Sequence, residues 1–257
     1  MRKLATIAVV LAVVAVSSQA SVVSVNFAAE SDADYYHGDT DSTGQMADTD
    51  VAGVVPAANW TNALGKAPSL TDLEDDSGAG TGMSLELTSP DTSEGWMMGE
   101  SSYTSPSSAD ATMMYATRAI AGAEDEIDIE LTDIPYATYD IYVYVGRYGD
   151  WTEAKDDTGE TTIGGTTYHY YRSDPDSGDM GDLPGAHVQA TSTDVDNPTA
   201  GATYVLFEDL TGSSQTISMF DDDGDELGIT GLQIVPEPAT MSLLAIGGLG
   251  ALLRRRR

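Results

Sequence analysis

Short runs in which apolar and polar residues alternate recur through the middle of the chain. Val23, Val25 and Phe27 alternate with polar residues near the start. The same period of two recurs at Met83, Leu85 and Leu87, and at Ile127, Ile129 and Leu131. This pattern predicts β-strands with one face in a core and one face in solvent.

Other segments predict further strands. Residues 139–145 are apolar on both faces apart from Asp140, which favours a central strand. Gly164-Gly165 separates two short β-rich runs, 161–163 and 166–171, and suits a two-residue hairpin turn. Three more strands are expected at 204–209, 215–220 and 229–235. We find no sustained 3.6-residue apolar period in this region, and only residues 113–120 offer one or two helical turns.

About nine short strands without intervening helices predict an all-β fold, an antiparallel β-sandwich. Two long segments interrupt the strands. Residues 28–80 are rich in Asp, Thr, Gly and Ala, and residues 172–203 contain Asp-Pro-Asp and Asp-Asn-Pro. Both are expected to be surface loops at one end or edge of the sandwich.

The N-terminal residues predict export. A positive start, Met1-Arg2-Lys3, precedes an apolar run of thirteen residues and the sequence Ser18-Gln19-Ala20, which ends on a small residue. This three-part pattern is typical of a secretory signal peptide over residues 1–20, cut by signal peptidase. The alternative is an N-terminal membrane anchor, but the run is shorter than the roughly 20 residues that span a bilayer as a helix.

The C-terminal residues predict a second targeting segment. Pro236-Glu237-Pro238 precedes a short apolar run, 241–253, and four arginines, Arg254 to Arg257. In this order the three features resemble the PEP-CTERM sorting signal, which implies a short hydrophobic sorting helix and processing by an exosortase. The apolar run is short for a lasting membrane span, so we expect only transient anchoring in the inner membrane. The final location is then the cell envelope or the extracellular space.

The middle domain is expected at residues 21–235, between the signal peptide (1–20) and the sorting tail (236–257). Its charge and cysteine content limit the partners it can bind and the ways in which it can be stabilised. Residues 21–238 hold all 42 acidic residues and only five basic ones, a formal net charge of −37 against −31 for the whole chain. Such a surface repels phosphate backbones and excludes nucleic acid as a partner. The chain has no cysteine, so core packing must stabilise this exported domain without disulfides.

A second resemblance spans most of this domain. It rests on Ser24 to Phe27, on residues 52–62 (AGVVPAANWTN), on residues 139–144 (YDIYVY) and on residues 228–235 (GITGLQIV). These segments resemble a group of exported β-sandwich proteins abundant in planctomycetes. The resemblance implies a jelly-roll fold similar to galactose-binding and carbohydrate-binding modules, and it implies no activity.

The search for catalytic motifs finds no nucleophile elbow, zinc-protease motif or phosphate loop. We therefore expect a protein that is not an enzyme and requires no cofactor. The one ion for which the sequence offers a loop is calcium, through Asp221, Asp223 and Asp225. The EF-hand spacing is not met, and a solvated hairpin loop is the alternative interpretation.

Aromatic residues raise the question of sugar binding. Trp151 and Tyr148 follow the expected central strand and are the best candidates for flat faces on which a pyranose ring stacks. Core packing is the alternative role for tryptophan in a sandwich.

Three functions remain open from the sequence. The leading hypothesis is an exported structural or interaction protein of the envelope or extracellular matrix. The alternative is a carbohydrate-binding protein that recognises a polysaccharide. A glycan hydrolase or lyase ranks last because abundant carboxylates alone support it.

Overall fold

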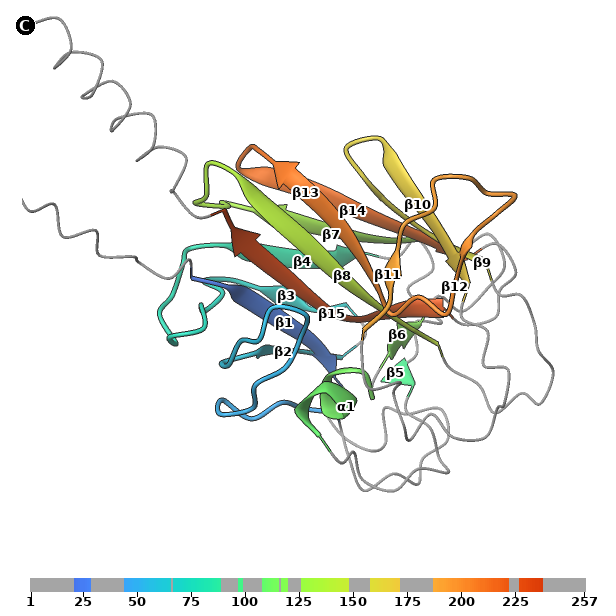
Figure 1. Cartoon of the computed structure of the whole chain (residues 1–257). Coiled ribbons are helices and arrows are strands. Elements are labelled where there is room, and N and C mark those ends of the chain that lie inside the picture. The colour runs from blue at the N-terminus through green and yellow to red at the C-terminus, as the bar shows by residue number, and fades with distance from the viewer. Residues whose placement is uncertain are drawn as a thin grey trace, which may run out of the picture.

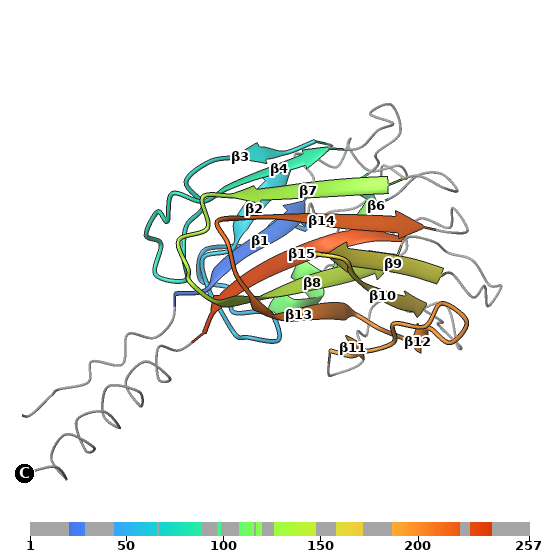
Figure 2. The same cartoon turned by 90° about the horizontal axis from the view of Figure 1, so that it is seen from above.

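The computed structural model describes residues 21–28, 44–65, 67–88, 97–98, 108–115, 117–119, 126–147, 158–171, 187–221 and 227–237. These residues form two mixed β-sheets that face one another (Figures 1 and 2). The expected all-β fold is confirmed. The jelly-roll connection stays a prediction, and the signal peptide lies outside the described residues.

The first sheet is built around the most apolar strands of the sequence. Its strand order is β11 (Gln189–Ala190), β13 (Tyr204–Leu210), β8 (Tyr139–Arg147), β15 (Leu227–Pro236), β1 (Val23–Ala28) and β2 (Thr61–Leu64). Two further strands, β6 (Thr117–Ala119) and β5 (Met97–Met98), extend it, with β6 paired to β15 and β5 paired to β6.

The second sheet has the order β12 (Thr199–Ala200), β10 (Thr166–Tyr171), β9 (Thr158–Ile163), β14 (Ser214–Asp221), β7 (Glu126–Thr132), β4 (Ser84–Thr88) and β3 (Ser69–Leu70). The predicted hairpin at Gly164-Gly165 joins β9 to β10. Both glycines have positive φ, 58° and 84°, as a two-residue hairpin turn of the mirror-image type requires.

Most strand pairs are antiparallel, as expected, but three are parallel. The pairs β1–β2, β10–β12 and β11–β13 run in the same direction. Each parallel pair contains a short strand from one of the two long segments expected to be loops. The expectation of a purely antiparallel sandwich is therefore wrong at these edges.

The core lies between the two sheets. Alternate residues of β1, β8, β13 and β15 meet alternate residues of β4, β7, β9 and β14 in one buried cluster. In β7 the apolar residues Ile127, Ile129 and Leu131 are buried, whereas Glu126, which precedes them, and Glu130, between the last two, are exposed. This confirms the predicted strand with one wet face.

Two expectations near the start of the domain are wrong. All six residues of β1 are buried, so this strand has no wet face. Asn26, a polar residue within it, donates to the Gly44 carbonyl at 2.7 Å and to Asn62 Oδ1 at 3.0 Å. The cause is the segment 44–62, which packs on the outer side of β1 instead of forming a loop at an end or edge.

The helical turn is shorter and earlier than expected. Helix α1 (Ala109–Met113) begins at Ser108, whose hydroxyl accepts from the Ala111 amide at 3.1 Å. Residues 117–119 then form strand β6, within the range for which a helical turn was predicted.

The strands define two ends of the sandwich. At one end, here named the tail end, Pro236 lies opposite Tyr139, and Leu210 also pairs with Tyr139. The start of β1 lies at this end as well, because Val23 pairs with Ile234. At the other end, the far end, Arg147 pairs with Leu227 and Asp221 with Gly159. The chain therefore enters and leaves the fold at the tail end (Figure 1).

Candidate functional site

The outer face of the first sheet, turned away from the core, carries a second buried cluster. Trp60 is 3 % exposed and packs against Tyr144, with ring centroids 6.1 Å apart. Seven residues form this outer-face cluster: Met46, Ala52, Trp60, Met113, Met114, Tyr144 and Tyr204. They come from the segment 44–60, from helix α1 and its end, and from strands β8 and β13.

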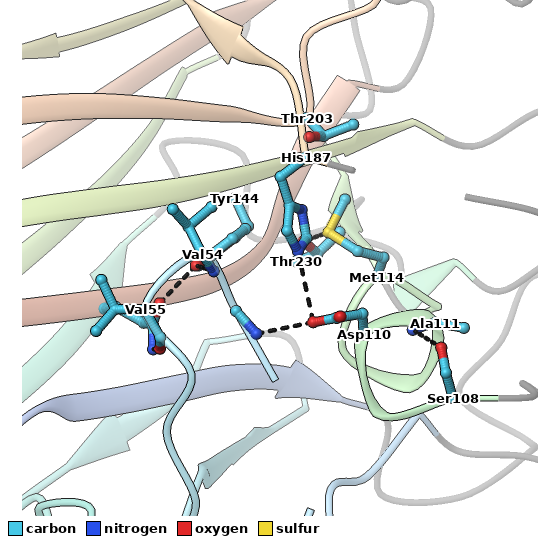
Figure 3. A network of polar contacts seen from close by, with 12 residues as sticks. Val54, Val55, Ser108, Asp110, Ala111, Met114, Tyr144, His187, Thr203 and Thr230 are labelled. Carbon is cyan, nitrogen blue, oxygen red and sulfur yellow. Dashed lines mark hydrogen bonds and ion pairs between the residues drawn. The ribbon is translucent and has the colours of Figure 1, made fainter. Parts of the chain in front are cut away.

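A short segment, residues 52–57, closes over this face and is here named the flap. The Val54 amide donates to the Tyr144 hydroxyl at 2.7 Å, and that hydroxyl donates to Gln233 Oε1 at 2.5 Å. Gln233 Nε2 donates in turn to the Val55 carbonyl at 2.8 Å. Tyr144 and Gln233 are fully buried, so the bond between them forms out of contact with water, where it is strong, and the two bonds to the flap are part-buried. Figure 3 shows the flap bonded to Tyr144.

A carboxylate links the flap to two other elements. Asp110, in helix α1, accepts from the Gly53 amide at 2.8 Å through Oδ1. The same oxygen lies 3.4 Å from His187 Nε2 (Figure 3). The His187 ring packs edge-on against Tyr144, with centroids 5.4 Å apart. Asp110 thus joins the flap, the helix and the segment that leads into β11.

This network holds the flap closed, and we name its three side chains, Tyr144, Gln233 and Asp110, the clasp. Each of them forms a hydrogen bond with a main-chain group of the flap. Burial raises the pKa of the Tyr144 phenol well above its usual range, with the Asp110 charge adding to the effect. Tyr144 therefore stays protonated at physiological pH and works as a structural donor.

Beyond the flap, the outer face carries a more accessible strip. Along β8 the residues Asp140 and Tyr142 point to the same side as Tyr144, since strand side chains alternate. Tyr142 is half-buried, and its ring lies near Tyr204, with centroids 6.0 Å apart and planes at 29°. Glu208, on β13, is exposed. The carboxylates of Asp140 and Glu208 contribute to the raised pKa of Tyr142, after the larger effect of burial. We name Asp140, Tyr142, Leu206 and Glu208 the outer strip.

The tail end holds the start of the predicted sorting motif. Strand β15 continues through Pro236, one residue past the domain boundary expected at residue 235. Pro236 is buried, and the Glu237 amide donates to the Thr138 carbonyl at 3.1 Å. Pro238 lies outside the described residues.

The residues predicted to bind sugar or calcium are attached to the far end. Tyr148 and Trp151 lie outside the described residues, in the connection from β8 to β9. Asp223 and Asp225 also lie outside them, in the connection from β14 to β15, which begins at Asp221. Both connections pass from one sheet to the other. The described strand ends that flank these connections are paired at the far end, Arg147 with Leu227 and Asp221 with Gly159.

Calcium binding stays a prediction. Within the parts of the chain that the structure describes, no three His, Asp or Glu side chains are placed to hold a metal ion. Of the predicted loop only the backbone of Asp221 belongs to those parts, as the last residue of β14.

Comparison with protein families concerns the tail end. Residues 235–257 match the family model of the PEP-CTERM protein-sorting motif. The chain carries a PEP-CTERM sorting signal. This signal marks an exosortase substrate that is exported through the membrane to the cell envelope or the extracellular space. A search among curated proteins finds no match to the chain.

The PEP-CTERM signal begins within the last strand of the fold. Val235 and Pro236 are the last residues of β15, so the signal continues the central strand without a linker. Among the described residues no helix is long and apolar enough to cross a membrane. The apolar run expected to do so, 241–253, lies outside them.

Proposed function

We propose that this chain is an exported structural or interaction protein of the cell envelope or extracellular matrix, delivered by an exosortase through its PEP-CTERM signal. The observation that carries the proposal is the direct continuation of β15 into that signal. Because nothing separates the fold from the signal, the sandwich is held against the membrane for as long as the tail is embedded.

The arrangement of the two ends supports an interaction role. Chain entry and the sorting signal share the tail end, so this end faces the membrane during anchoring. The far end then points away from it. The described ends of the strands that flank the two connections, Arg147 of β8 and Asp221 of β14, lie at this far end.

We also propose that the protein is not an enzyme and requires no cofactor, and the outer-face network supports this proposal. Its one histidine–carboxylate pair, His187 with Asp110, shares its carboxylate oxygen with the Gly53 amide of the flap. A carboxylate that holds a covering segment closed contributes to stability, and it is poorly placed to orient a base toward substrate.

Deleting residues 239–257 tests delivery. The truncated chain should lack a membrane-associated precursor and appear in the soluble fraction beyond the inner membrane, because the apolar run and Arg254 to Arg257 are what retain the chain in that membrane. Cell fractionation with immunoblotting measures this. As control, the full chain in a strain without exosortase should stay uncut in the membrane fraction. Identical distribution of truncated and full chains would exclude the proposal.

A second function, carbohydrate binding, is favoured by the outer strip. The half-buried Tyr142 ring, flanked by the carboxylates of Asp140 and Glu208, combines an aromatic face with acceptors for sugar hydroxyl groups. The strip is an alternative to Tyr148 and Trp151, which the sequence predicts to bind sugar and which lie outside the described residues.

Three variants separate these two places in a polysaccharide pull-down. If the outer strip binds, Tyr142→Ala should weaken retention by about tenfold through loss of the stacking face. Trp151→Ala should then have no effect. Tyr171→Ala, a half-buried tyrosine of the second sheet, is the matched control for loss of an aromatic side chain. Retention that is unchanged in both Tyr142→Ala and Trp151→Ala argues against carbohydrate binding at either place.

A further inference from the structure

The first two residues of the sorting motif Pro236-Glu237-Pro238 belong to the folded sandwich. Pro236 is buried and lies opposite Tyr139 of β8. The amide of Glu237 is bonded to the Thr138 carbonyl at 3.1 Å. An enzyme that reads a short motif as an extended peptide needs the side chains and main-chain groups of that motif free. Here one side chain and one amide are already engaged.

The attachment of these residues is one-sided. Strand β15 pairs with β1 only as far as Ile234, which lies opposite Val23. From Val235 onward its sole pairing among the described strands is with β8. The three residues from Val235 to Glu237 can therefore separate from β8 while the rest of β15, including buried Leu232 and Ile234, stays in the sheet.

Like charges surround the end of the strand. An irregularity in β13 places Asp209 at φ 57°, with its amide bonded to Asp140 Oδ1 at 3.0 Å. A hydrogen bond with the Asp209 carboxyl, some loss of solvation, and the charges of Asp209 and Asp140 all raise the pKa of the exposed Glu237 side chain. When all three carboxylates are ionised, their repulsion works against the docked position of Glu237.

We propose that the folded sandwich masks the start of its own sorting motif, and that residues 235–237 must separate from β8 before the processing enzyme can act. This inference rests on the proposed processing by an exosortase. Processing then depends on a local opening equilibrium of the last strand residues. The apparent affinity of the enzyme for the chain is its affinity for the open form multiplied by the fraction of chains that are open.

A flexible insertion tests the masking directly. About six Gly and Ser residues placed between Val235 and Pro236 would move the motif out of the sheet and keep its sequence intact. Pulse-chase labelling in cells that contain the exosortase measures the rate at which precursor is converted to mature protein. This rate should increase by roughly tenfold. The control places the same insertion between Gly164 and Gly165, in a hairpin turn with open space around both residues, and should convert at the native rate.

The outcomes separate this inference from the proposed function. Equal conversion rates for the native chain and the motif insertion would overturn the masking, and the exosortase assignment would stand. Absence of conversion in every version, the native chain included, would overturn both.

Hydrogen exchange gives a readout that does not depend on the enzyme or on the folding of a variant. In the native full-length chain, held in detergent micelles, the Glu237 amide should exchange more slowly than in an unstructured peptide. In the motif insertion it should exchange at the peptide rate. A native Glu237 amide that exchanges at the peptide rate would refute the masking, whatever the insertion does to folding.

Discussion

Replacing Gly53 with alanine should lower the free energy of unfolding by about 3 kcal/mol and release the flap. Gly53 has φ +95°, and an added Cβ would lie 2.5 Å from Gln233 Oε1 and 2.8 Å from the Tyr144 hydroxyl oxygen. Gln233 is fully buried and its amide is bonded on both sides, so it cannot move aside without breaking the clasp. Urea unfolding of the purified domain measures the change.

The matched control for Gly53→Ala is Gly82→Ala. Gly82 has φ +80°, yet a Cβ there would meet no atom within 4 Å. Its substitution should therefore cost only the backbone strain, about 1 kcal/mol. The difference between the two variants isolates the contribution of the clasp. Equal losses in both would mean that the flap bonds contribute nothing to stability.

Release of the flap should also be visible locally. In Gly53→Ala the amide of Val54 loses the Tyr144 hydroxyl as its acceptor, and the Trp60 ring loses part of its cover. Faster hydrogen exchange at Val54 and a shift of tryptophan fluorescence toward that of exposed indole should accompany the loss of stability. Unchanged exchange at Val54 would contradict the clasp.

The strands could be predicted because burial imposes a period of two on the sequence. In β7 the alternation of Ile127, Ile129 and Leu131 with acidic residues follows directly from one buried and one solvated face. In β8 the apolar character of both faces correctly indicated a central strand, which lies between β13 and β15. The local sequence pattern is sufficient to predict a strand where the burial of each face is reflected in the residues on that face.

The covering of the outer face could not be predicted in this way. The Asp- and Gly-rich composition of residues 28–80 is typical of surface loops, yet Trp60 in that range is buried against Tyr144. The contacts that hold it there join residues far apart in the sequence, such as Gly53 with Asp110 and Val54 with Tyr144. Such pairings leave no periodic signal, so the site they build was missed.

One signal for this site was present in the sequence. Tyr142 and Tyr144 alternate with Ile141, Val143 and Val145 along a central strand. Alternation of two apolar types on a strand buried on both faces indicates two different environments. The aliphatic residues face the core, and the tyrosines face the opposite side, where the flap bonds the Tyr144 hydroxyl and Tyr142 lies in the more accessible outer strip.

The tyrosines lead to the second large effect, a steep loss of stability in alkaline solution. Burial is the largest cause of a raised phenol pKa at five positions, Tyr136, Tyr139, Tyr142, Tyr144 and Tyr204. For Tyr136 the pKa rises to about 12, with the charges of Asp75 and Asp76 adding to the effect of burial. Each of these phenols is therefore harder to ionise in the folded chain than in the unfolded one.

The sign follows from proton linkage. As pH rises above about 10, the tyrosines of the unfolded chain lose protons while the buried ones keep theirs, so the unfolded state is stabilised. The stabilising contribution is complete below pH 10 and disappears as pH passes through the raised values. For Tyr136 the window is pH 10 to about 12. After allowance for solvent screening, this half-buried residue contributes about 1 kcal/mol, and the other four phenols act in the same direction.

Urea unfolding across this window should show a falling midpoint, and tyrosinate absorbance should rise together with unfolding instead of before it. The variant Tyr136→Phe should flatten part of the decline, because it removes one of the five linked protons, although it also removes the bond from the Tyr136 hydroxyl to the Ser21 carbonyl. Its stability must therefore be compared as a slope against pH and not at one pH. The contrary result is full tyrosinate absorbance near pH 10 in a protein that is still folded. It would show that these phenols are not buried and would contradict the outer-face cluster around Tyr144.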